Sequence, residues 1–143
     1  MKALATLLRV HRLRLDEQGR VMQDLQALKS QIESEIVRLE NELRAEQDTA
    51  RQSTVASFAF AAYSARNREQ RERLRASLAD IDAKIEVARD ALAAIFRELK
   101  TIENVQAGLE RRRLAVVQRT EQAAMDAVAL GMFRQRHAKG QGW

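Results

Sequence analysis

Aliphatic side chains recur in alternating steps of four and three residues through the first third of the chain. The series runs through Leu4, Leu8, Leu15, Met22, Leu25, Ile32, Ile36, Leu39 and Leu43. Where this spacing requires an apolar residue and none is present, the chain has His11, Gln18 and Lys29, so the phase is kept. This spacing places the residues in one stripe along a helix face, the seam of a coiled coil. Such a seam marks a helix that packs on another helix along most of its length.

The same spacing returns in the second half of the chain. It runs through Leu74, Leu78, Ile81, Ile85, Ala88, Leu92, Ile95, Leu99 and Ile102. Between the two seams lies a polar segment in which Ser53 or Thr54 offers a hydroxyl that caps a following helix. Two matched seams joined by a polar segment predict an all-α fold: two long helices in an antiparallel coiled-coil hairpin, the second helix longer than the first. The rival is one unbroken helix in a parallel dimer, which would carry a weak seam in its middle.

We expect a single coiled-coil domain over residues 1–143. Its predicted parts are a first helix at about 2–50, a tip at about 47–54, a second helix at about 54–137 and a flexible tail at 138–143. A turn near Gln52 pairs residues whose numbers sum to about 104, which places Leu25 near Leu78. The first helix then ends opposite Ile102, and the rest of the second helix overhangs it.

Composition agrees with long helices and excludes several classes of protein. The chain has no proline and no cysteine, 31% of its residues are charged and only 4% are aromatic. No stretch is long and apolar enough to span a bilayer. Residues 1–15 are basic and amphipathic like a targeting peptide, but they share the phase of the seam, which favours the first turns of the coil.

Catalytic chemistry has no visible basis in the sequence. The two histidines, His11 and His137, lie far apart without cysteines, and no glycine-rich phosphate loop is present. His11 occupies a seam position and is interpreted as a polar residue that sets register. We therefore expect neither an enzyme nor a cofactor or metal site.

Two surfaces are candidates for binding a partner. Three of the six aromatic residues, Phe58, Phe60 and Tyr63, fall where the leucine spacing stops. They either cap the tip by packing on Val55 and the end of helix one, or form a docking patch.

The overhang, residues 104–143, has seven Lys and Arg against three Asp and Glu, and it continues an apolar stripe. A basic amphipathic helix suits an acidic protein groove, an anionic membrane or nucleic acid. Arg111, Arg112 and Arg113 lack the interleaved aromatics of a nucleic-acid reader, so no specific nucleic acid is expected.

The order of these segments resembles the FliJ family of bacterial flagellar export proteins, with the stalk proteins of virulence-type secretion as cousins. The segment VASFAFAAYSARNREQ resembles the aromatic stretch of the family near its tip, and LERRR followed by EQAAMDAVA resembles its Arg-rich and Met-Asp-Glu elements. Two positions depart from the family: Ala127 stands where the family has Glu, and Asn67 where it has leucine.

The resemblance implies a component of the type III flagellar export apparatus, in a cell capable of chemotaxis and motility. It would act as a rotor-like stalk in the ring of the hexameric export ATPase, link the ring to the cytoplasmic domain of the export gate, and escort export chaperones. The protein would be cytoplasmic and peripheral at the inner-membrane export apparatus. The resemblance assigns gate binding to Phe58, Phe60 and Tyr63, and ring binding to the overhang residues Arg111, Arg112, Arg113, Val116, Met125 and Asp126.

Two other hypotheses stay open. One is a generic coiled-coil adaptor or homodimer without an ATPase partner, and the other is a basic amphipathic binder of membranes or nucleic acid.

Overall fold

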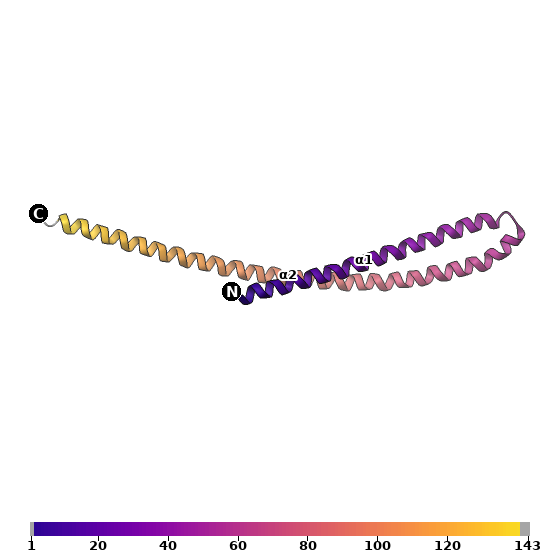
Figure 1. Cartoon of the computed structure of the whole chain (residues 1–143), viewed down its shortest axis with the longest axis horizontal. Helices are drawn as coiled ribbons and strands as arrows, with labels where there is room; N and C mark the ends of the chain where they lie inside the picture. The colour runs from indigo at the N-terminus through magenta and orange to yellow at the C-terminus, as the bar shows by residue number, and fades with distance from the viewer. Residues whose placement is uncertain (1, 141–143) are drawn as a thin grey trace. The chain divides into compact units, whose positions relative to one another are not determined.

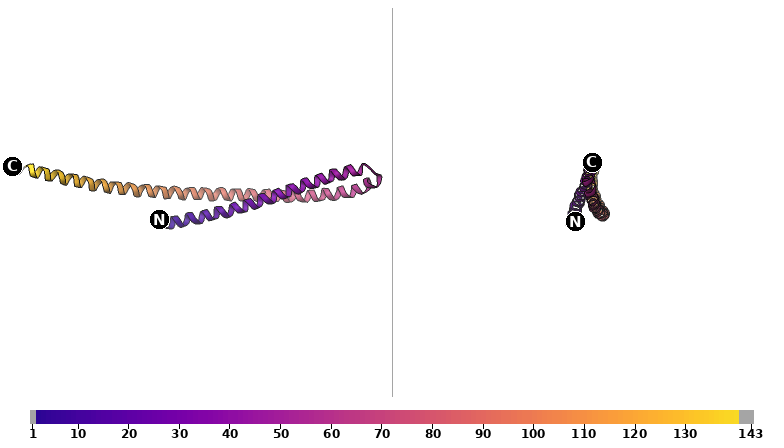
Figure 2. Two further views of the ribbon diagram at one scale, coloured as in Figure 1. Left: turned by 45° about the horizontal axis from the view of Figure 1, so that its top comes forward. Right: turned by 90° about the vertical axis from the view of Figure 1, so that its right-hand side faces the viewer.

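The structure, a computed structural model, describes residues 2–140 and consists of two helices. Helix α1 spans Lys2–Ala50 and helix α2 spans Thr54–Gly140, and the described residues contain no strand. The indigo-to-purple α1 and the first half of α2 run antiparallel and side by side, as Figure 1 and the left view of Figure 2 show. The predicted hairpin of two unequal helices is confirmed. By its internal contacts the chain divides into two units, one of residues 9–98 and one of residues 99–140 with residues 2–8.

In the unit of residues 9–98, the seam is where the sequence pattern predicts it. Every seam position of both helices in this unit is buried or half-buried. The most buried aliphatic side chains are Ile36, Leu39, Ala50, Ile81, Ile85 and Ala88, at 3–9% exposure. No large side chain among the described residues falls below 2% exposure, because a two-helix core has no third layer to cover it. Stability is therefore spread over many partly buried contacts.

Two of the three polar residues of the α1 seam, His11 and Lys29, contact side chains of α2. His11 is 7% exposed, and its Nε2 lies 3.0 Å from Glu98 Oε2. Lys29 Nζ lies 2.8 Å from Asp82 Oδ1, and the hydrogen bond and charge of this carboxylate raise the pKa of Lys29. His11 and Lys29 thus add polar cross-helix contacts to the apolar packing of the seam.

The turn is short and has no special backbone. It occupies residues 51–53, without glycine, proline or a residue at positive φ. Ser53 Oγ accepts a hydrogen bond from the backbone N–H of Ala56 at 3.0 Å, so the predicted cap is confirmed at Ser53. This break between α1 and α2 contradicts the rival of one unbroken helix.

The predicted pairing register is wrong by several residues. A pairing sum of 104 would place residue 65 opposite Leu39 and residue 93 opposite His11, whereas Leu39 contacts Asn67 and His11 contacts Glu98. The departure is two residues at Leu39, near the tip, and five at His11, so a single displacement at the turn does not account for all of it.

In the other unit, α2 changes from partly covered to fully exposed. Leu8 and Leu99 are buried at 4% and 6% exposure, and Leu109 is still half-buried. Every residue from 116 to 139 is exposed. The cover given by α1 thus extends past Ile102, as the corrected register requires. Helix α2 ends at Gly140 rather than 137, so residues 138–140 are helical; the rest of the expected flexible tail, residues 141–143, lies outside the described residues.

Replacing Ile36 and Leu39 together by alanine tests the seam. Each buried large-to-small change removes about 2 kcal/mol or more of unfolding free energy, so we expect a combined loss of about 4 kcal/mol. The matched control is Val37→Ala in the same turns of α1, where the side chain is 53% exposed, and it should change the unfolding free energy by less than about 0.5 kcal/mol. Denaturant melts in which the two variants behave alike contradict this seam.

Candidate partner-binding surfaces

The tip carries a cleft between the end of α1 and the start of α2. Phe60 and Tyr63 are half-buried, and their ring centroids lie 6.5 Å apart with a 35° tilt. The cleft has a volume of about 400 Å³ and is lined by Glu46, Thr49, Ala50, Ala56, Ala59, Phe60, Tyr63 and Arg66. Three alanines and two aromatic rings line it beside a carboxylate and a guanidinium, so it suits an apolar side chain with polar neighbours.

The three aromatic residues of the tip do not behave as one patch. Phe58 is 88% exposed and lies outside the lining of the cleft, whereas Phe60 and Tyr63 contribute to it. Val55 is 83% exposed and gives the aromatic rings little cover. The cleft sets Phe60 and Tyr63 beside the end of α1, as packing at the tip predicts, but without cover from Val55. The docking patch stays a prediction.

Sequence reasoning missed the role of Asn67, which was treated only as a departure from the docking pattern. The side chain is 3% exposed, and its Nδ2 donates a 2.9 Å hydrogen bond to the backbone carbonyl of Leu39 on α1. Its Oδ1 accepts a 2.7 Å hydrogen bond from Arg71 Nε. A signal was available: Asn67 lies seven residues before Leu74, in phase with the second seam.

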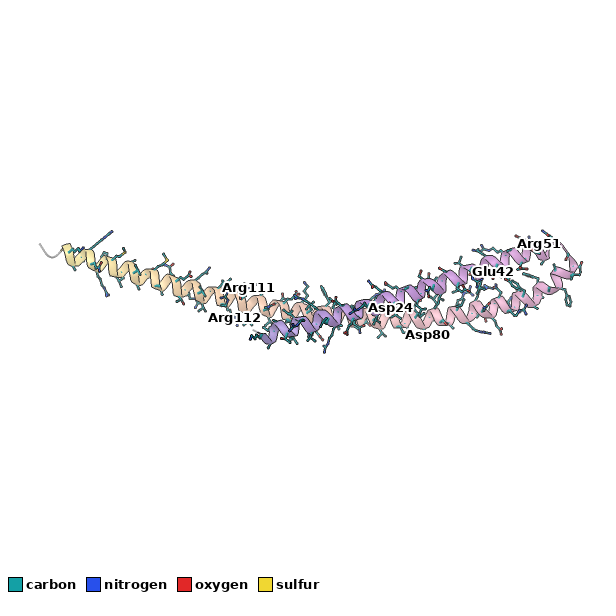
Figure 3. All side chains as sticks on the ribbon, viewed as in Figure 1. Asp24, Glu42, Arg51, Asp80, Arg111 and Arg112 are labelled. Carbon is teal, nitrogen blue, oxygen red and sulfur yellow. The ribbon has the colours of Figure 1, made fainter. Side chains whose placement is uncertain are left out.

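The arginine triplet of α2 divides into two kinds of residue. Arg113 donates two hydrogen bonds to the carboxylate of Glu110, at 2.8 and 3.3 Å. These bonds hold the pKa of Glu110 below its ordinary value and raise the pKa of Arg113. Arg111 and Arg112 are exposed, and they lie where α2 passes the N-terminal end of α1 (Figure 3). A partner thus meets two guanidinium groups that are not committed to Glu110.

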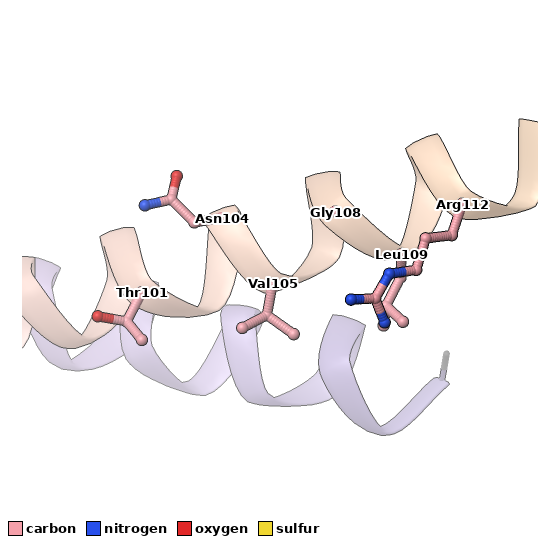
Figure 4. A pocket seen from close by; sticks show the side chains of 6 residues that line it. All are labelled: Thr101, Asn104, Val105, Gly108, Leu109 and Arg112. Atoms are coloured by element: carbon pink, nitrogen blue, oxygen red, sulfur yellow. The ribbon is translucent and has the colours of Figure 1, made fainter. Parts of the chain in front are cut away.

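A shallow groove of about 420 Å³ lies on α2 just before the fully exposed segment. It is lined by Thr101, Asn104, Val105, Gly108, Leu109 and Arg112 (Figure 4). Gly108 is helical, and a Cβ built on it would meet nothing closer than Arg111 Nη2 at 3.9 Å. The fold itself therefore does not require a glycine at this position.

Beyond this groove, the exposed part of α2 presents apolar side chains to solvent. Val116 is 58% exposed and Met125 is 67% exposed, and Val128, Leu130, Met132 and Phe133 are each at least half-exposed. Asp126 accepts a 3.1 Å hydrogen bond from Gln122 one turn earlier. The Phe133 ring packs on His137 at a centroid distance of 4.3 Å, a pair that the sequence analysis did not anticipate. The six predicted overhang residues lie on one helix, and nothing in the described chain covers them from Val116 onward.

Residues 2–140 contain no cluster of three or more His, Asp or Glu side chains able to hold a metal ion. None of the helices in the described part of the chain combines the length and apolar character needed to cross a membrane. The features that the hairpin does offer are a cleft at the tip and exposed apolar and basic side chains on α2.

The fold defines a two-helix coiled-coil protein whose second helix is uncovered over residues 116–139. The family model described as "Flagellar FliJ protein" matches residues 1–138, nearly the whole chain. The chain belongs to the FliJ family and is a component of the flagellar export apparatus. No curated protein and no solved structure matched the chain.

Proposed function

We propose that this protein is the stalk of the export ATPase: the exposed end of α2 enters the ring of the hexameric ATPase, and the tip docks on the cytoplasmic domain of the export gate. The observation that carries the proposal is the exposure of residues 116–139 on every side, with apolar side chains among them. A single amphipathic helix does not bury its own stripe, so this segment requires a partner that surrounds it.

Charge supports a ring lining rather than self-association. Residues 104–143 have seven Lys and Arg against three Asp and Glu, so two such helices side by side would repel each other. An acidic pore complements the helix and would use Arg111 and Arg112 directly, because Arg113 is bonded to Glu110. The adaptor or homodimer without an ATPase partner is the competing function.

The other parts of the proposal rest on different support. Gate docking is supported by the accessible aromatic cleft at the tip. Escort of export chaperones is supported by family membership alone, as is a cytoplasmic position at the inner membrane. The stalk would act by contact and movement, without catalytic residues of its own.

Removing the exposed end of α2 tests the ring contact. Truncation after Ala115 deletes the fully exposed segment and leaves the covered part of the chain intact, so we expect the hairpin to keep its melting temperature and ATPase stimulation to be lost. Truncation after Ile102 should give the same loss of stimulation. The double reversal Arg111→Glu with Arg112→Glu should lower stimulation at least tenfold, and salt should weaken the wild-type contact because exposed charges are screened over about 10 Å at 0.1 M.

The charge-matched control reverses Arg44 and Arg68, which are exposed on the hairpin, and it should stimulate like the wild type. Equal stimulation by the truncated and intact chains would remove the stalk mechanism and leave the adaptor.

Changing Phe60 and Tyr63 to alanine tests the tip. Both rings line the cleft, so binding to the gate domain should weaken at least tenfold, while partial burial limits the loss of stability to about 1–2 kcal/mol. Phe58→Ala is the matched control, and it should leave both the affinity and the melting temperature unchanged because the ring is 88% exposed and outside the cleft. If the double variant loses stability but its folded fraction binds normally, the two rings serve packing only.

A further inference from the structure

The aliphatic seam leaves the register of the hairpin open. Its spacing repeats every seven residues, so sliding α2 past α1 by one heptad again places seam residues opposite seam residues. The turn adds little constraint, because it has neither glycine nor proline and no residue at positive φ. A turn several residues earlier would find Asp48 or Thr49 as capping residues in place of Ser53. Something other than leucine packing must select one register.

Asn67 is one selecting contact. It lies in the seam at 3% exposure, and its amide hydrogen-bonds the carbonyl of Leu39 across the helix interface. An aliphatic side chain here would add apolar burial, so the asparagine costs stability relative to leucine. A buried asparagine in a coiled-coil core is known to specify register at such a cost. A slip that shortens the α1 side of the turn would place Phe60 instead of Asn67 opposite Leu39.

Lys29 is the second selecting contact. Its ammonium reaches Asp82 at 2.8 Å from a seam position of α1. Residues one heptad to either side of Asp82 on α2 are Arg75 and Arg89. A one-heptad slip in either direction therefore replaces an attractive carboxylate by a guanidinium opposite Lys29. The native register is favoured by the pair and both neighbouring registers are disfavoured by repulsion.

We propose that Asn67 and Lys29 are positioning residues that together hold α1 and α2 in one register and so form the tip cleft. The cleft needs Phe60 and Tyr63 beside Thr49 and Ala50, and the slip that shortens the α1 side of the turn moves Phe60 away from that site to the level of Leu39. The consequence for docking on the gate rests on the proposed function, whereas the register itself is a property of this chain alone.

The test uses intramolecular distances, which the cysteine-free sequence makes direct. Spin labels go on cysteines at positions 20 and 68, both exposed and staggered along the hairpin, so that sliding changes their separation. One heptad of sliding moves one helix by about 10 Å along the other. The wild-type labels should give a single narrow distance distribution.

The variant Lys29→Asp with Asn67→Leu should give a second population displaced by about 10 Å, one heptad of helix rise. It removes the buried amide and sets a carboxylate at position 29 against Asp82 in the native register, while Arg75 or Arg89 becomes attractive to that carboxylate in a slipped register. Asn67→Leu alone should keep or raise the melting temperature while broadening the distribution. The control Arg73→Asp, whose arginine pairs with Glu69 on the same helix, should keep the narrow distribution.

A single unchanged distance in the helical, folded double variant would overturn the proposal. Gate-domain affinity is the second measurement, and it should fall in proportion to the fraction of chains outside the native register. A slipped distribution with unchanged affinity would spare the register proposal and overturn its link to the tip. Absence of binding by the wild type would overturn gate docking, while the distance measurement would still decide the register.

Discussion

Lateral packing of one aliphatic stripe on another is the interaction on which the rest of this structure depends. Two helices alone make a thin core, so even Leu39 and Ile81 keep a few per cent of their surface in water. No described part of the chain supplies a third layer. A helix segment is therefore either covered by its partner helix or exposed. Because α1 is shorter than α2, residues 116–139 are exposed.

Much of the fold was predictable because period and capping are local properties. Steps of four and three from Leu4 onward define a helix face without reference to its partner, and the loss of that spacing marks the bend. Ser53 was identifiable as a cap because a hydroxyl after a polar stretch is a common start for a helix. Phe60 and Tyr63 were recognised as a candidate site because they fall where the leucine seam stops.

The pairing of the helices was not predictable in the same way. A heptad pattern states which face packs but is satisfied by several registers, so the offset that brings Leu39 to Asn67 depends on how α2 starts at the tip. Asn67 was misjudged for a related reason: a polar residue among seam positions is easily taken as a missing apolar contact. Its hydrogen bond to a backbone carbonyl becomes visible only once the partner helix is placed, as does the cover that α1 gives to Leu109.

The distribution of charge follows the same division between covered and uncovered helix. Through residue 103 the chain has eighteen Lys and Arg against seventeen Asp and Glu, and cross-helix pairs such as Lys29 with Asp82 and Arg75 with Glu40 use some of them. After residue 103 the balance is seven against three, with no second helix to supply carboxylates along the fully exposed segment. Helix propensity alone can keep such a segment helical, and polar helix formers would stabilise it equally well in water. Helix formation therefore does not explain why Val116 and Met125 are apolar. The proposed ring lining would account for apolar side chains on this uncovered, cationic helix, because an acidic pore would bury the stripe and supply negative charge.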